Sequence, residues 1–182
     1  SKPVVENLLS KKQVMNRSYD PLRLINTYGA FGVVTEAREE FVISSATHWD
    51  GPWKEYEFKA KPGDVNRSPR FLSPYHHRLD WQMWIAAVGR SVERSPWVFS
   101  FLIKLLQQDK AVLDGLMTGD PWENSPEPPK YIRIDRYLYR FHRPRRGETQ
   151  PPYWDREQID KLYPRLGIAT VENLRADERR FF

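Results

Sequence analysis

Hydrophobic and polar residues alternate along the chain in a way that predicts four β-strands. Residues 26–35 and 40–47 are rich in the β-branched and aromatic residues that strands favour. In residues 53–60, aromatic and charged side chains alternate with a period of two, which predicts a half-buried antiparallel strand. A fourth strand is predicted at residues 131–142. Hydrophobic residues occupy both of its alternating phases, so this strand is expected to be covered on both faces or to bulge near Arg136.

Three helices are predicted between the third and fourth strands. Their ranges are 79–88, 97–107 and 110–118. The first is hydrophobic on nearly every side, which predicts burial on several sides, and Gly89 is expected to cap its C-terminal end. Ser95 precedes Pro96 and is the expected N-cap of the second helix. Asp109 is the expected N-cap of the third.

These elements predict an α+β fold: an antiparallel β-sheet or β-sandwich with a helical insertion and extended polar termini. Three segments are expected, namely an N-terminal extension at residues 1–25, a domain at residues 26–142 and a C-terminal tail at residues 143–182. A short helix is predicted within the tail at residues 155–162, and residues 167–182 are expected to trail behind it.

Composition narrows the classes of protein to which the chain can belong. Its 182 residues are 14% aromatic, which argues for a folded domain. The absence of Cys excludes disulfides, thiolate metal sites and Cys nucleophiles. The net charge of +5 is too modest to establish a nucleic-acid partner. The longest apolar-rich run, residues 96–106, is too short to span a bilayer. The chain opens at Ser1, so we expect it to have been released from something larger.

Enzyme chemistry is not expected. The chain lacks the nucleophile-elbow, zinc-helix, phosphate-loop and dinucleotide-binding motifs. The adjacent His76 and His77 would point in opposite directions in an extended chain, and neither they nor His48 and His142 predict a metal site. Asp80 would be a candidate general acid or base if it lined a pocket. Its favoured interpretation is structural, at a helix start or beside Arg78. No catalytic residue, metal or cofactor is therefore expected.

Arginine is concentrated near the end of the last predicted strand. The residues concerned are Arg133, Arg136, Arg140, Arg143, Arg145 and Arg146. The favoured interpretation is a solvated or protein-paired face, followed by contact with anionic lipid headgroups. Nucleic acid is the least favoured partner, because residues 137–141 lack the glycines of the RNA-recognition strand. Arg140, Arg143, Arg145 and Arg146 are retained as candidate partner contacts.

Tryptophan is the second candidate for partner contact. Trp49 and Trp53 flank a predicted Asp-Gly-Pro turn, and Trp81 and Trp84 are three residues apart on a predicted helix, where they would be neighbours. Core packing is the favoured interpretation of these rings. The functional alternative is an aromatic surface that docks a partner or lies at a membrane interface. Asn16 begins a possible glycosylation sequon.

Four stretches carry a family resemblance. They are Asn26–Gly32, Tyr56–Asp64, Arg78–Trp84 and Tyr131–Phe141. In this order they resemble the C-terminal domain of the lipase maturation factor family, over roughly residues 22–142. The Leu-Asp-Trp-Gln-Met-Trp stretch at residues 79–84 is the most distinctive.

The resemblance implies a function. Members of this family span the membrane of the endoplasmic reticulum several times, and this domain follows the spans. It implies a chaperone-like, non-enzymatic module that assists the folding or assembly of partner proteins, with secreted lipases as clients. One alternative is a structural accessory subunit of a large membrane complex, with a mitochondrial location. The other is an enzyme.

Overall fold

The computed structural model describes residues 38–71, 76–89 and 91–178, together with Leu9. The strand expected at residues 26–35 lies outside these described residues, and so does the extension expected at residues 1–25, Leu9 apart. Asn16 of the possible sequon lies outside them as well.

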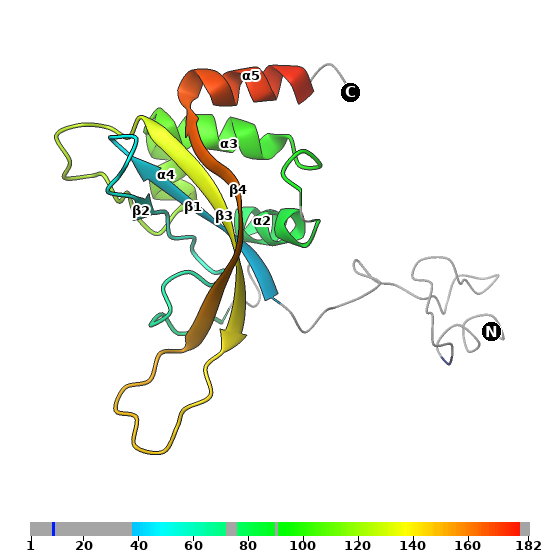
Figure 1. The fold of residues 1–182 in the computed structure, drawn as a ribbon, viewed down its shortest axis with the longest axis vertical. Coiled ribbons are helices and arrows are strands. Elements are labelled where there is room, and N and C mark those ends of the chain that lie inside the picture. Colours follow the sequence, from blue (N-terminus) through cyan, green and yellow to red (C-terminus); the bar gives the residue numbers. More distant parts are fainter. Residues whose placement is uncertain (1–8, 10–37, 72–75, 90, 179–182) are drawn as a thin grey trace. The chain divides into compact units, whose positions relative to one another are not determined.

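Four strands in the described part of the chain form one antiparallel sheet, in the order β2-β1-β3-β4 (Figure 1). The strands are β1 (Arg38–Ala46), β2 (Lys54–Glu55), β3 (Tyr131–Phe141) and β4 (Trp154–Gly167). β1 and β3 pair along almost their whole lengths, with Ile43 opposite Ile134. The sheet and the helices that accompany it confirm the predicted α+β fold and its antiparallel sheet.

The helices with described bounds are α2 (Arg78–Val88), α3 (Trp97–Leu106), α4 (Lys110–Leu116) and α5 (Ile168–Glu178). The first three form the predicted helical insertion, since they follow β2 and precede β3. None of the helices in the described ranges is long and apolar enough to cross a bilayer.

Two of the three predicted caps are confirmed. The N–H of Gly89 donates to the carbonyl of Ile85 at the end of α2. The Asp109 carboxylate accepts from the N–H of Val112 at the start of α4, at 3.3 Å. The prediction for Ser95 was wrong, because Pro96 occupies the N-cap position of α3 and no side chain caps it.

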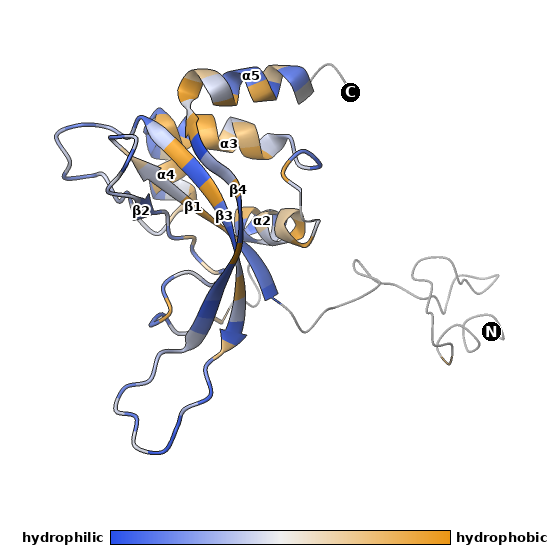
Figure 2. Ribbon diagram, viewed as in Figure 1, coloured by the Kyte–Doolittle hydropathy of each residue, from blue (hydrophilic) through white to orange (hydrophobic). Residues whose placement is uncertain are grey.

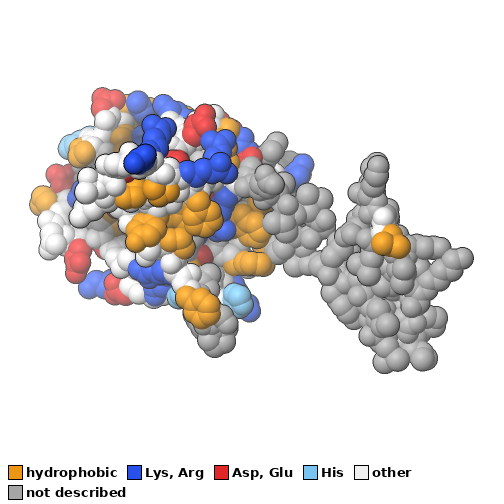
Figure 3. Space-filling view, turned by 90° about the horizontal axis from the view of Figure 1, so that it is seen from below, with side chains coloured by type: hydrophobic (Ala, Val, Ile, Leu, Met, Phe, Trp, Pro, Cys, Tyr) orange, Lys and Arg blue, Asp and Glu red, His pale blue; other side chains and the backbone are white. Residues whose placement is uncertain are grey.

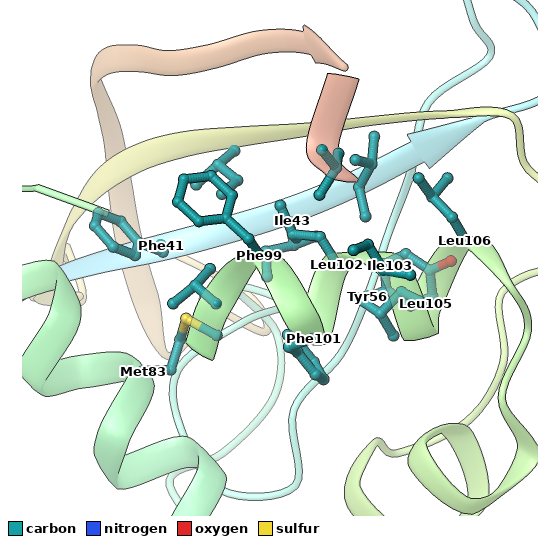
Figure 4. Close-up of a cluster of buried hydrophobic side chains, with 14 of the residues drawn as sticks. Phe41, Ile43, Tyr56, Met83, Phe99, Phe101, Leu102, Ile103, Leu105 and Leu106 are labelled. Carbon is teal, nitrogen blue, oxygen red and sulfur yellow. The ribbon is translucent and has the colours of Figure 1, made fainter. Parts of the chain in front are cut away.

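The main core lies between α3 and one face of the sheet. Phe99 and Leu102 are fully buried and lie on the side of α3 that faces β1 (Figure 4). From the sheet, Phe41 and Ile43 enter the same cluster. In Figure 2, α3 is largely hydrophobic, whereas the loop that joins β3 to β4 is hydrophilic. The burial of α3 on almost every side follows from its sequence, which is apolar except for Ser100 and Lys104.

The strand predicted at residues 53–60 is mostly absent. Only Lys54 and Glu55 pair with β1, and Phe58 makes an isolated bridge to Met117. The alternating aromatic positions of this segment do point into the protein, since Tyr56 and Phe58 are both buried. Phe58 packs near Phe101 of α3, with ring centroids 6.1 Å apart, so core packing draws this segment away from regular pairing with β1.

The helix predicted at residues 155–162 was also wrong, because these residues belong to β4. β4 pairs with β3 from Trp154, opposite Phe141, to Gly167. The predicted trailing segment at residues 167–182 contains α5, which packs against α3 and places Val171 in the core. Backbone pairing with β3 therefore overrides the weak helical pattern of this polar sequence.

The predicted irregularity near Arg136 is confirmed. The register between β3 and β4 shifts between Arg136 and Tyr137. Beyond the shift, Tyr139 packs with Val42 and Trp154 in a second, smaller buried cluster on the strands. Burial raises the pKa of Tyr139 to about 12, and its hydroxyl donates to the carbonyl of Gly63 at 2.9 Å. The second cluster thus covers β3 around Tyr139, whereas Arg136, Tyr137 and Leu138 are only partly buried.

Candidate functional site

The residues predicted to contact partners fall into three separate places. Trp49 and Trp53 lie at the turn after β1, Trp81 and Trp84 lie on α2, and the four arginines lie at the end of the β3–β4 hairpin. Trp84 contacts Arg38 at the start of β1, whereas Trp49 follows its end. Nine strand residues span roughly 27 Å at about 3.4 Å each. The two tryptophan pairs therefore do not form one aromatic surface.

The tryptophans at the turn are held by arginines of the sheet. The Trp49 ring meets Tyr131 edge-on with centroids 5.4 Å apart, and the guanidinium of Arg165 lies 5.1 Å from the Trp49 centroid. The Arg133 guanidinium lies 4.7 Å from the Trp53 ring. Gly51 lies between Trp49 and Trp53 in the sequence, and its φ of 104° is in the left-handed region that favours glycine. These cation–π contacts stabilise the turn itself.

Helix α2 carries a hydrophobic stripe, which we define as Trp81, Trp84, Ile85 and Val88; all are exposed except Trp84, which is half-buried. Trp81 is 45% exposed, Ile85 41% and Val88 45%. The Trp81 and Trp84 ring centroids are 5.5 Å apart, as the three-residue spacing predicted. The spacing of the four positions places them on one side of a helix. The expectation that this helix is buried on several sides was therefore wrong.

The opposite side of α2 is anchored in the fold. Met83, Ala86 and Ala87 are buried there. Asp80, in the first turn, is also buried, and one of its carboxylate oxygens accepts from the N–H of Ala60 at 2.6 Å and of Lys61 at 2.9 Å. Asp80 thus fixes the preceding loop to α2, in agreement with its favoured structural interpretation, and it also lines a pocket beside the stripe.

A pocket of about 190 Å³ adjoins the stripe. It is lined by Arg38, Ala60, Lys61, His76, His77, Asp80, Trp81 and Trp84. The Arg38 guanidinium lies 5.8 Å from the Trp84 ring, and the His76 ring centroid lies 6.4 Å from that of Trp81. The pocket therefore joins aromatic walls to cationic and imidazole groups at its rim.

Buried charged residues lie next to the pocket. Glu40 of β1 is fully buried and lies between Arg38, with Nε 2.9 Å from one carboxylate oxygen, and Lys61, with Nζ 3.3 Å from the other. Lys61 is also buried and donates to the carbonyl of Phe41 at 2.9 Å. This arrangement was not predicted. Arg38 and Glu40 are two residues apart, but local sequence carries no signal for Lys61, which lies about twenty residues further along the chain.

The arginine cluster divides into a paired part and an exposed part. Arg136 binds Glu39 at 3.1 Å and Asp160 at 2.6 Å, and Arg133 binds Asp135 at 3.1 Å. These pairs agree with the favoured interpretation of a protein-paired face. Asp135 is buried, and the loss of solvent raises its pKa, an effect that the nearby Arg133 opposes.

The exposed part lies at the β3–β4 hairpin. Arg140 is 3.4 Å from Glu157, and Arg143, Arg145 and Arg146 are exposed in the connecting loop. No salt bridge of these three is found within the described residues. Phe141 stacks on Trp154 with centroids 4.4 Å apart, yet it is 67% exposed.

His142 joins the two sides of this loop. One ring nitrogen lies 2.7 Å from Asp155 and the other lies 3.1 Å from Glu148. These hydrogen bonds, that of Asp155 first, raise the pKa of His142. Glu148 also accepts from the N–H of Arg145, which is the first cause of its lowered pKa. No group of three His, Asp or Glu side chains suited to hold a metal ion occurs among the described residues.

Comparison with known proteins places this architecture in a family. The chain matches the lipase maturation factor C-terminal domain over residues 24–164. It is similar to lipase maturation factor 1 of Bos taurus, with 44% identity over 90% of this chain and 30% of the relative. Lipase maturation factor 1 of Homo sapiens is 42% identical over 94% of this chain and 31% of the relative.

A second group of relatives is named lipase maturation factor 2. That of Rattus norvegicus is 38% identical over 86% of this chain and 22% of the relative. The chain thus spans less than a third of the length of these curated relatives. No solved structure matches the chain.

Proposed function

The chain belongs to the lipase maturation factor family, and we propose that it is a non-enzymatic protein-interaction domain that assists the folding or assembly of partner proteins. The names of the relatives point to lipases as clients. We further propose that the domain works beside the membrane of the endoplasmic reticulum, as the family resemblance implies. The accessory-subunit alternative, with its mitochondrial location, is not favoured, because the relatives are named as maturation factors.

The observation that carries this proposal is the hydrophobic stripe on α2. Exposed, contiguous apolar side chains on a helix are typical of surfaces that bind another protein. Because the other side of α2 is anchored by Met83 and Asp80, the stripe is presented on a rigid support. A rigid support reduces the ordering cost of association.

The adjoining pocket gives the proposed site a polar rim. Protein interfaces commonly combine a hydrophobic centre with polar groups at the edge, and Trp and Arg are enriched at their strongest contacts. Trp81 and Trp84 would bury apolar surface of the client, while Arg38 and the two histidines at residues 76–77 would pair with its polar groups.

The test replaces exposed apolar residues of the stripe with charges. The double variant Ile85→Glu/Val88→Glu is introduced into the intact maturation factor, in cells that lack it and that express a lipase. We expect the lipase recovered with the factor to fall at least about tenfold, as loss of two interface contacts predicts, and secreted lipase activity to fall with it. Both positions are exposed, so the fold is expected to tolerate the change.

The matched control is Leu116→Glu/Ile168→Glu, which adds the same charge at two helix positions of similar exposure, 42% and 39%. It is expected to leave recovery and secretion unchanged. Equal losses for the two double variants would assign the effect to added charge rather than to the stripe. Unchanged recovery in both would remove α2 as the client-binding element.

A further inference from the structure

The end of the β3–β4 hairpin combines exposed aromatic side chains with arginines. We define the hairpin surface as Phe141, Arg143, Arg145, Arg146 and Tyr153. Phe141 is 67% exposed and Tyr153 is 51% exposed. All three arginines are exposed. The loop that carries them extends beyond the other described elements, at the end of the sheet opposite α5 (Figure 1).

The hairpin surface is held at its base. The N–H groups of Tyr153 and Trp154 both donate to the carbonyl of Val65, at 2.9 and 3.1 Å. The indole of Trp154 donates to the carbonyl of Arg67 at 3.0 Å. These bonds join the hairpin to the loop that follows β2, so the arginines project from a fixed base.

Charge at the hairpin is unbalanced in favour of the exposed arginines. The acidic residues of this region are already engaged: Asp155 and Glu148 with His142, and Glu157 with Arg140. Among the described residues no salt bridge is found for Arg143, Arg145 or Arg146; of the three, the Arg145 charge acts on Glu148 and helps to lower the pKa of that carboxyl. Positive charge is therefore left for an external anion.

The exposed aromatic rings indicate what kind of anion this is. Phe141 and Tyr153 require an apolar medium if they are to leave water, and arginine requires an anionic one. The interfacial region of a bilayer offers both within a few ångströms, and aromatic residues are enriched there. Figure 3, seen from the side of the hairpin loop, shows hydrophobic side chains in the middle of this face, with Lys and Arg beside them and both acidic and basic side chains further out.

We infer that the hairpin surface docks on a bilayer that contains anionic lipids, with the rings at the headgroup level and the arginines on the headgroup phosphates and carboxylates. The proposal goes beyond the binding of a client and uses different residues. A strongly acidic protein and single-stranded nucleic acid are the competing partners. Both match the charge, but neither provides an extended apolar layer for two rings on a projecting loop.

The test is co-sedimentation of the 182-residue chain with lipid vesicles. Vesicles of phosphatidylcholine with about 30% phosphatidylserine are expected to bind the chain, and vesicles of phosphatidylcholine alone to bind it weakly. Each Arg near an anionic surface adds about fivefold to partitioning, so Arg143→Ala/Arg145→Ala/Arg146→Ala is expected to weaken binding on the order of 100-fold. At high salt, where charge is screened, some binding is expected to remain, and Tyr153→Ser is expected to weaken that remaining binding.

The matched control removes three other exposed cations, as Arg94→Ala/Lys110→Ala/Lys130→Ala. It lowers the net charge equally and is expected to lose little binding. Equal losses for both triple variants, or equal binding to the two kinds of vesicle, would overturn the proposal. Polyglutamate or single-stranded oligonucleotide that binds the chain as tightly as the anionic vesicles, with no effect of Tyr153→Ser, would also overturn it and favour a soluble polyanion.

Discussion

At the residue scale, His142 makes the hairpin sensitive to pH. Its pKa lies above the usual 6.5 because Asp155 and Glu148 both bind the ring. A group whose pKa is raised by folding stabilises the fold fully below its unfolded pKa, and this stabilisation is lost as the pH rises through the folded pKa. We therefore expect His142→Ala to be destabilising at mildly acidic pH, with the difference from wild type vanishing as the pH rises through the folded pKa.

Urea unfolding across this pH range measures the difference, and an NMR titration of the ring gives the pKa directly. Asp155→Asn removes the largest cause of the shift, so it is expected to lower the His142 pKa towards 6.5. If the free energies of unfolding of the wild type and of His142→Ala differed by the same amount at acidic and alkaline pH, the two carboxylates would not bind the protonated ring.

Asp80 provides the second prediction at this scale. Asp80→Ala leaves the N–H groups of Ala60 and Lys61 without their acceptor, and each buried unsatisfied group costs about 1–3 kcal/mol. We expect the free energy of unfolding to fall by about 2–4 kcal/mol in a urea titration. Asp114→Ala, at an exposed position on α4, is expected to change it by less than about 0.5 kcal/mol. Similar effects of the two substitutions would contradict the anchoring role.

Individual residues also show how far sequence alone can reach. The spacing of Trp81 and Trp84 was sufficient to predict that they are neighbours, because a helix fixes that relation locally. The bidentate pair of Arg156 with Glu55, at 2.8 and 3.0 Å, joins residues 101 positions apart and has no local signal. The sequence thus proposes tryptophans and arginines one at a time, whereas Ile85, Val88 and Tyr153, and the grouping of residues into a stripe, a pocket and a hairpin surface, needed the fold.

At the element scale, the same distinction explains β4 and α5. Segments with strong local patterns, such as α3 or β1, were predicted close to their observed bounds. β4 is an edge strand whose residues are mostly exposed, and charged residues interrupt its hydrophobic positions, so no alternation marks it. Its identity as a strand comes from pairing with β3, which is a tertiary effect. Conversely, residues 53–60 alternate as a strand does, but the burial of Phe58 against α3 interrupts the pairing.

Helix α5 is expected to be required for stability, although it lies in a segment that the sequence presents as a tail. Val171 is fully buried against the core that α3 forms with the sheet. Val171→Asp would bury an unpaired charge, and we expect it to lower the free energy of unfolding by about 3 kcal/mol or more. Thr170→Asp, at the exposed neighbouring position, serves as the control. Equal unfolding midpoints for the two variants would mean that α5 is dispensable.

At the scale of the whole molecule, the sheet keeps the α2 stripe and the hairpin surface on different elements. One face of the sheet packs on α3, the start of β1 lies beside α2, and β3 and β4 continue into the projecting loop (Figure 1). Substitutions on separate elements that share no partners usually have additive free energies. We therefore expect Ile85→Glu/Val88→Glu to reduce lipase recovery without changing vesicle binding. Arg143→Ala/Arg145→Ala/Arg146→Ala is expected to do the reverse.

A protein that carries all five substitutions tests this separation. Its lipase recovery should fall only as far as in the α2 double variant, and its vesicle binding only as far as in the arginine triple variant. Lipase recovery and vesicle co-sedimentation, measured on the double variant, the triple variant and the combined protein, provide the comparison. If the arginine substitutions also reduced lipase recovery from detergent-solubilised protein, where no bilayer is present, the hairpin surface would itself contact the client. The loop would then be a second protein-binding element, and the separation of roles along the sheet would be refuted.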